Sequence, residues 1–489
     1  MGRLTGKQSV TIRRPMIEVW INIWDWTNGQ VKESVDITDS LMLYQFQKTI
    51  KTPLGTCVLT IVPLVQSNPP NKLVHAMDRF NVMDVVRIYE FGVLKFQGYI
   101  KRIAANGSIA PDGKPVRNVM IQATHMGGLF AEGEIGWLLV SQRMLGANFT
   151  SVEGKAASFV TKVCQLYDTS NLKFGTLLST LVDEWFNFLG EMGVTTFRQY
   201  LKTYLNYTDG TGADAFDDEV IWPKSPAFFY EAQNGDVSFW GEMQKMMEVP
   251  FNEIFFDEGP RSVTIKTSEV TLGEDTTYLI GRPTPFNGRI KSGVTLDYFN
   301  QLPLQTIPLS HLIRWDLNKM TDEAYSMYVV NPDYLGLTEF TLKAMGDVKV
   351  DTDALNKYLC RTLTAELFYD RKVEKMKTEL IQNQQNIEDF VKDNITTLYN
   401  WFKDNDKSLN GAITMHVPSE NDICIGSRID IEGINGEFYV EGLSHTWQYG
   451  GAVVSSLNVT RGWGKDNQPI QLTDAIFIGG GFLSDKSIR

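Results

Sequence analysis

The chain has 489 residues, of which 43% are hydrophobic and 21% charged, and its formal net charge is −12. These values are ordinary for a globular protein of three or four domains, and the absence of any Lys/Arg stripe argues against phosphate-driven nucleic-acid binding. No window reaches the roughly 18 apolar residues of a membrane span, and no apolar signal region follows the N-terminal basic residues. We therefore expect synthesis in the cytoplasm without a signal peptide and without stable membrane insertion.

The first 128 residues predict a set of antiparallel strands. Short runs alternate apolar and polar side chains, which is the period of a strand with one buried face. Asn28-Gly29 predicts a turn, and Gly92 predicts the centre of a hairpin. About six strands at this spacing favour a closed barrel or a sandwich. The predicted strands are residues 16–26, 44–50, 58–65, 84–91, 93–103 and 116–123.

Helical patterns follow after Gly128. Ser151 predicts the cap of a helix over 152–167, and further helices are predicted over 176–192 and 238–248. Between them, Asp217-Asp218-Glu219 is interpreted as a solvated acidic turn, because it lacks the ligand spacing of a cation site.

A small subdomain is predicted next. It contains a strand over 262–266, and Pro283 and Pro285 predict an extended exit from it. We expect Glu253 and Arg282 to form an ion pair that clips this subdomain in place. No acid–base partner lies at a fixed spacing from Glu253, so a catalytic role is not predicted.

The last third of the chain predicts a domain that is split in sequence. Strands at 306–309 and 326–332 are expected to join the strands after residue 411 in one barrel. Between them, residues 353–402 contain no Pro and no Gly, and apolar residues recur at steps of three and four. This pattern predicts one long helix or two in tandem. Such a helix could pack on a partner subunit or lie on its own domain.

Residues 423–463 predict four short strands, the last two as a hairpin. Asn410-Gly411, Asn435-Gly436 and Tyr449-Gly450-Gly451 are expected turns. Little rigid structure is expected after Gly464.

Three parts of the sequence resemble the hub proteins of phage tail baseplates, which belong to contractile-tailed phages and related contractile injection systems. Residues 438–445 (Phe-Tyr-Val-Glu-Gly-Leu-Ser-His) and 457–462 (Leu-Asn-Val-Thr-Arg-Gly) resemble the final barrel of that family. Residues 84–100 resemble its first barrel. Residues 250–257 (Pro-Phe-Asn-Glu-Ile-Phe-Phe-Asp), followed by 281–286, resemble its middle part.

The resemblance implies an α+β fold that is mainly antiparallel β. It would have two tube-like β-barrel domains, a helical or mixed insertion, and a long helix before the C-terminal barrel strands. The expected divisions are an N-terminal barrel (1–128), a helical/mixed insertion (129–230), a small α/β subdomain (231–288), a first part of the second barrel (289–350), a long helical segment (351–410), a second part of that barrel (411–463) and a C-terminal tail (464–489).

The same resemblance implies a structural role and no enzymatic activity. Hub proteins of this kind look like homotrimers whose six barrels match a six-fold tail tube, while their other side receives a three-fold central spike. The implied partners are further copies of the chain, the tube protein, the spike protein, the tape-measure protein and other baseplate proteins. The implied location is the virion tail baseplate or an injection-system baseplate.

No catalytic, cofactor-binding or metal-ligating residue is predicted. The four cysteines have no metal or redox spacing, and His445 is interpreted as a hydrogen-bonded structural residue. Glu132 and Glu134 lie close in sequence, but a glycosidase needs two carboxylates across a cleft. The alternative function, a tail-associated peptidoglycan hydrolase, has no motif in the chain. The cysteines and other histidines are Cys57, Cys164, Cys360, Cys424, His75, His125, His311 and His416.

Overall fold

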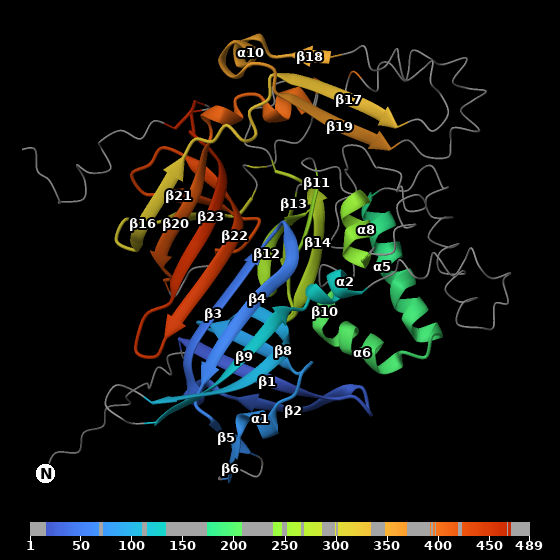
Figure 1. Cartoon of the computed structure of the whole chain (residues 1–489), viewed down its shortest axis with the longest axis vertical. Helices are drawn as coiled ribbons and strands as arrows, with labels where there is room; N and C mark the ends of the chain where they lie inside the picture. Colours follow the sequence, from blue (N-terminus) through green and yellow to red (C-terminus); the bar gives the residue numbers. More distant parts are fainter. Residues whose placement is uncertain are drawn as a thin grey trace, which may run out of the picture.

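The computed structural model is mostly antiparallel β-sheet with few helices, which confirms the predicted α+β, mainly β, fold class (Figure 1). The residues that it describes are 16–67, 72–109, 115–133, 174–207, 238–246, 252–265, 268–285, 299, 302–333, 348–368, 392, 395–396, 398–418, 423–466 and 468–470.

The N-terminal strands form the first half of a large sheet, in the order β3-β4-β9-β8-β7-β1-β2. Positive φ angles at Gly29 and Gly92 confirm both predicted turns. Strand β2 was not predicted, because four of its seven side chains are exposed and its apolar pattern is weak. The bounds are β1 Ile17–Asp25, β2 Gln30–Asp36, β3 Leu41–Thr49, β4 Thr52–Ile61, β7 Val85–Glu90, β8 Val93–Ile109 and β9 Pro115–His125; the short elements η1 Thr38–Ser40, β5 Leu64–Ser67, β6 Lys72–His75 and α1 Ala76–Arg79 lie between them.

The second half of the sheet is assembled from segments far apart in sequence, as predicted. Strand β15 (Leu304–Ile307) pairs in parallel with β21 (Arg428–Ile431), and β16 (Leu312–Asn318) pairs with β20 (Leu409–His416). The hairpin of β22 (Glu437–Gln448) and β23 (Val454–Trp463) confirms the predicted final pair of strands.

Three details of the C-terminal prediction are wrong. Residues 423–463 hold three strands, not four, because residues 423–427 form a turn. Asn410 and Gly411 lie inside β20, where Gly411 packs against the backbone of the neighbouring strand β16. The left-handed conformation occurs at Gly433 and Gly450 and not at Gly436.

The two halves repeat one pairing pattern. Strands β3, β4, β9, β8 and β7 pair in the same order as β16, β20, β23, β22 and β21. The irregularities repeat as well. The register shift between Leu41 and Leu43 in β3 has its counterpart between Leu312 and Arg314 in β16. The shift after Ile100 in β8 has its counterpart after Val440 in β22. The shared bulges align the halves residue by residue.

The sequence predicted two separate β-barrels, but within the residues that the structure describes the two halves do not form them. Strand β3 pairs with β22, so the described strands of both halves join one 13-stranded sheet that ends at β2 and β16. No described set of strands closes on itself. One strand edge of each half, that of β3 in the first and that of β22 in the second, joins the halves. One hydrophobic core extends across both.

A mixed α/β region packs beside the first half (Figure 1). The helices predicted at 176–192 and 238–248 are confirmed, whereas the helix capped by Ser151 and the acidic turn at 217–219 lie outside the described residues. Aromatic side chains of this region form a second core with Trp24 of β1. Its elements are α2 Gly128–Glu132, α5 Phe174–Glu191, α6 Thr195–Tyr204, β10 Leu205–Asn206, α8 Phe239–Met246, β11 Asn252–Glu258, β12 Arg261–Ile265, β13 Ser268–Leu272 and β14 Thr277–Pro283.

The prediction of one long helix or two in tandem over 353–402 is wrong for residues 359–368. Helix α10 (Thr352–Tyr358) ends at Leu359, which has a φ of 60°, and β19 (Thr362–Phe368) follows. There Thr and apolar residues alternate, which favours a strand. Residues 369–391 lie outside the described part, residues 398–402 are helical, and η4 spans Asn405–Lys407.

Strand β19 pairs in parallel with β17 (Met327–Asp333), which also pairs with β18 (Val348–Val350). The prediction that 326–332 joins the second barrel is therefore wrong. These strands form a sheet of their own, at the top of Figure 1.

Candidate functional site

The pairing of β3 with β22, here called the seam, joins the two halves of the sheet. It aligns Leu43–Thr49 with Gly442–Gln448 in antiparallel register. Tyr44 stacks on Trp447 with ring centroids 6.0 Å apart, and the ring of Phe46 lies 5.0 Å from that of His445. Backbone hydrogen bonds and aromatic packing therefore hold residues about 400 positions apart in one fixed register.

A buried hydrogen-bonded contact crosses the seam. His445 Nδ1 lies 2.8 Å from a carboxylate oxygen of Glu90 in β7, and the Tyr44 hydroxyl donates to the same carboxylate. Burial alone would raise the pKa of Glu90, but the imidazole of His445 and the Tyr44 hydroxyl hold it below its ordinary value. His445 is thus hydrogen-bonded, as expected from the sequence.

The predicted ion pair between Glu253 and Arg282 is also confirmed. Arg282 Nε lies 2.8 Å from Glu253 Oε1, and both side chains are buried. The contact reaches further than predicted, because Arg282 also donates to the Gly426 carbonyl at 2.8 Å and to the Tyr439 hydroxyl at 3.1 Å. The pair therefore ties the small subdomain to the second half of the sheet.

Gly426 is required for this approach. Its φ is +75°, and a Cβ there would lie 2.7 Å from Arg282 Nη2 and 2.9 Å from the ring of Phe255. Any other residue would therefore be strained and would push the guanidinium away from the carbonyl.

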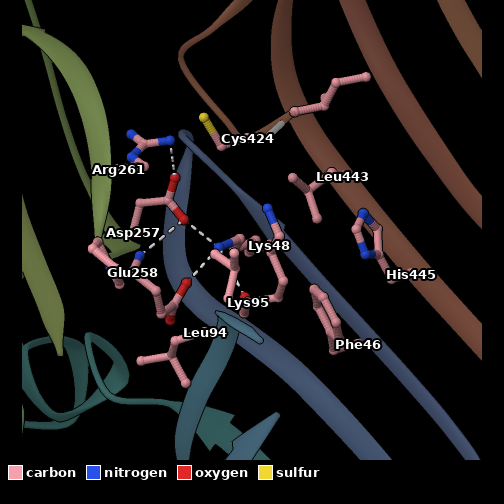
Figure 2. A pocket seen from close by; sticks show the side chains of 13 residues that line it. Phe46, Lys48, Leu94, Lys95, Asp257, Glu258, Arg261, Cys424, Leu443 and His445 are labelled. Carbon is pink, nitrogen blue, oxygen red and sulfur yellow. Dashed lines mark hydrogen bonds and ion pairs between the residues drawn. The ribbon is translucent and has the colours of Figure 1, made fainter. Parts of the chain in front are cut away.

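Among the described residues, a group of buried polar and charged side chains consists of Lys48, His125, Asp257, Glu258 and Arg261, here called the charge cluster. Figure 2 shows its members other than His125. Lys48 Nζ contacts the carboxylates of Asp257 and Glu258, and it donates to the Lys95 carbonyl at 3.0 Å. Glu258 Oε1 lies 2.6 Å from His125 Nε2 and accepts from the Gln97 amide at 3.1 Å. Arg261 pairs with Asp257.

The charges of the cluster balance one another, with two cations, two carboxylates and one imidazole. Burial would raise the pKa of Glu258, but Lys48 and His125 hold it well below its ordinary value. Burial would lower the pKa of Lys48, but Asp257 and Glu258 raise it. Strands β3 and β9 of the sheet thereby hold β11 and β12 of the subdomain in place. The charge cluster therefore fixes β3, β9 and the β11–β12 part of the subdomain relative to one another.

Sequence reasoning missed the charge cluster, although one signal points to it. In β3, Tyr44, Phe46 and Lys48 share the inward face, so a lysine occupies a position where the pattern demands an apolar residue. A buried lysine requires anionic partners. The sequence does not say that these come from Asp257 and Glu258, over 200 residues away.

The remaining candidates are not brought together. Glu132 pairs with Lys101, and Glu134 lies outside the described residues. Cys57 and Cys424 are buried and Cys360 is exposed, while Cys164 is not among the described residues. Across the described ranges, no three His, Cys, Asp or Glu side chains form a metal-binding group. No helix in the described part of the chain is both long enough and apolar enough to cross a membrane.

Comparisons with known proteins gave matches among solved structures alone, since neither a family model nor a curated protein sequence matches the chain. One match is a tail protein from Neisseria meningitidis MC58, with 9% identity, a TM-score of 0.43, and coverage of 91% of this chain and 97% of that one. Another is the 43 kDa tail protein of prophage MuSo2 from Shewanella oneidensis, with 10% identity, a TM-score of 0.42, and coverage of 93% and 99%.

A third match is an Escherichia coli component of the type VI secretion system, described as similar to the T4 bacteriophage tail proteins gp27 and gp5. It has 6% identity, a TM-score of 0.33, and coverage of 88% of this chain and 76% of that chain. These three structural neighbours are thus two tail proteins and one secretion-system component. With TM-scores below 0.5, the roles and partners of these proteins are not transferred to this chain.

Proposed function

We propose that the chain is a structural hub of a tail or injection-system baseplate. One observation carries the proposal: two halves with the same strand pairing and the same bulges lie side by side in one sheet. Each copy thus supplies two equivalent units. Three copies supply six, the number that a six-fold tube presents, while the assembly itself keeps three-fold symmetry for a central spike.

The buried contacts support this role. The seam, the Glu253–Arg282 pair and the charge cluster fix the two halves and the subdomain rigidly, as a symmetry adaptor requires. The buried charged groups named above are engaged in ion pairs and hydrogen bonds, and we assign the protein no catalytic role. We infer partners of four kinds: further copies of this chain, the tube protein, the central spike protein and other baseplate proteins. The inferred location is the tail baseplate, where the hub forms part of the tail channel.

Co-expression with the products of neighbouring reading frames tests the proposal. We expect the tagged chain to capture a tube protein and a spike protein in one complex. That complex should contain three copies of the hub chain and three copies of the spike chain. A complex with a different hub stoichiometry would contradict the adaptor role. A zymogram with bacterial cell wall tests the enzymatic alternative separately, and a clear band would overturn the structural assignment.

A further inference from the structure

The repeat leaves one strand contact unfilled within a single copy. In the seam, β3 of the first half pairs with β22 of the second. By the shared pairing and bulges, the counterpart of β3 in the second half is β16, and the counterpart of β22 in the first half is β8. If the seam is repeated around a ring, β16 must meet β8 of another copy.

Both counterparts have open edges among the described residues. Strand β16 lies at the end of the sheet and pairs with β20 on one side alone. Strand β8 pairs with β7 only as far as Tyr99, and from Lys101 to Ile109 it is bonded to β9 on one side. Most side chains of this stretch are exposed. Strand β22 receives β3 on the corresponding edge, beyond the residues that pair with β21.

We propose that β16 of one copy adds in antiparallel register to residues 102–109 of β8 in a second copy, which repeats the seam between chains. This inference rests on the proposed function, and it specifies the surface through which the copies join. Unpaired strand edges are ready templates for such addition. Each copy offers one β16 and one β8, so the contact is head-to-tail and closes into a ring under cyclic symmetry.

The shared bulges also give the register. Thr446 lies opposite Gln45 in the seam, and the corresponding residues are Asn106 and Asp316. Trp447 lies opposite Tyr44, and their counterparts are Gly107 and Trp315. A Cβ at Gly107 would meet no atom within 4 Å, so the site has room for the Trp315 ring of the added strand.

The end of the seam provides one further bond. The Tyr449 amide donates to the Met42 carbonyl at 2.9 Å, and the corresponding residues are Ile109 and Ile313. Both isoleucines are exposed in the single chain, Ile109 by 78% and Ile313 by 48%. The proposed register places these two apolar side chains close to each other, which would shield both from water.

Cysteine cross-linking tests the register. With Cys164 and Cys360 replaced by Ser, Asn106→Cys and Asp316→Cys are introduced at two exposed positions. Directly opposite residues of antiparallel strands have Cα atoms about 4.5–5.5 Å apart, within the range of a disulfide. We expect mild oxidation to give ladders of two and three linked chains. Chains with one cysteine each should link only when the two variants are mixed.

The matched control is Ser108→Cys with Asn318→Cys, which uses the same strands and the same faces. In the proposed register Asn318 lies four residues from the partner of Ser108, about 13 Å away, and no ladder is expected. Light-scattering mass on the same samples distinguishes a failure of the strand contact from a failure of the proposed hub function. A trimer that does not link through Asn106 and Asp316 overturns the strand contact and leaves the hub standing. A protein that forms no trimer overturns both.

Discussion

At the scale of single residues, the charge cluster makes the strongest prediction for stability. Glu258→Gln removes the carboxylate that faces Lys48 and His125, so that the buried Lys48 keeps only one of its two carboxylate partners, Asp257. Breaking a buried pair typically costs about 3–5 kcal/mol. Urea unfolding at pH 7 should show a loss of this size. Glu132→Gln is the matched control, because its pair with Lys101 is partly exposed, and it should cost less than about 1 kcal/mol. Equal effects would contradict the account of the cluster.

The lowered carboxylate pKa values predict acid sensitivity. The pKa of each of Glu90, Glu258 and Glu441 is lowered in the folded protein. The unfolded chain therefore takes up protons first, and the contribution of these groups is full above the unfolded pKa and lost as pH falls through the folded one. We expect the urea midpoint to fall from about pH 5 downward. In Glu258→Gln the fall should be shallower, and an unchanged slope would speak against the assignment.

The hydroxyl of Tyr439 makes a smaller contribution. It bonds to Glu253 and Arg282, where the small subdomain meets the second half of the sheet. Tyr439→Phe keeps the ring and leaves two buried charged groups with one fewer partner, at a cost of about 1–3 kcal/mol. Tyr449→Phe, at an exposed tyrosine, should leave thermal stability unchanged. If the hydroxyl contact were unimportant, the two variants would have the same melting temperature.

At the scale of elements, strand β22 carries both the core and the seam. The side chain of Val440 is fully buried in the core. Val440→Asp would place an unpaired charge there, which should lower the free energy of unfolding by about 3–5 kcal/mol. We expect poor folding and failed assembly, measured by soluble yield and by particle formation. Gln448→Asp, on the same strand but exposed, should assemble normally. Particles of Val440→Asp that assemble and inject would remove β22 from the core.

Strands in which apolar and polar residues largely alternate were predictable from sequence, and β1 and β7 are examples. The pairing of distant segments was predictable only in outline. The split of the second half followed from the pattern, but nothing local distinguishes β16, which joins the sheet, from β17, which does not. The helix prediction over 353–402 failed at residues 359–368, because apolar spacing of three and four also fits the alternation of Thr362–Phe368. The seam leaves no local sequence signal, because it pairs residues about 400 positions apart.

At the scale of the whole molecule, charge predicts how a channel would behave. Each copy carries a formal net charge of −12, and no run of Lys or Arg is available to line a lumen. A wall without basic residues releases no counterions from a polyanion and should let it pass. Filter-binding with duplex DNA should therefore show weak association. Tight DNA binding that weakens steeply as salt rises would contradict a channel wall without basic residues.

The central claim is that each copy supplies two of six equivalent units. Light-scattering mass of the purified chain, at rising concentration and in complex with its spike, tests this most directly. We predict a complex with three copies of the 55.3 kDa chain, since two or four copies would present four or eight units to the tube. A stable complex that contains one, two or six copies would contradict the account.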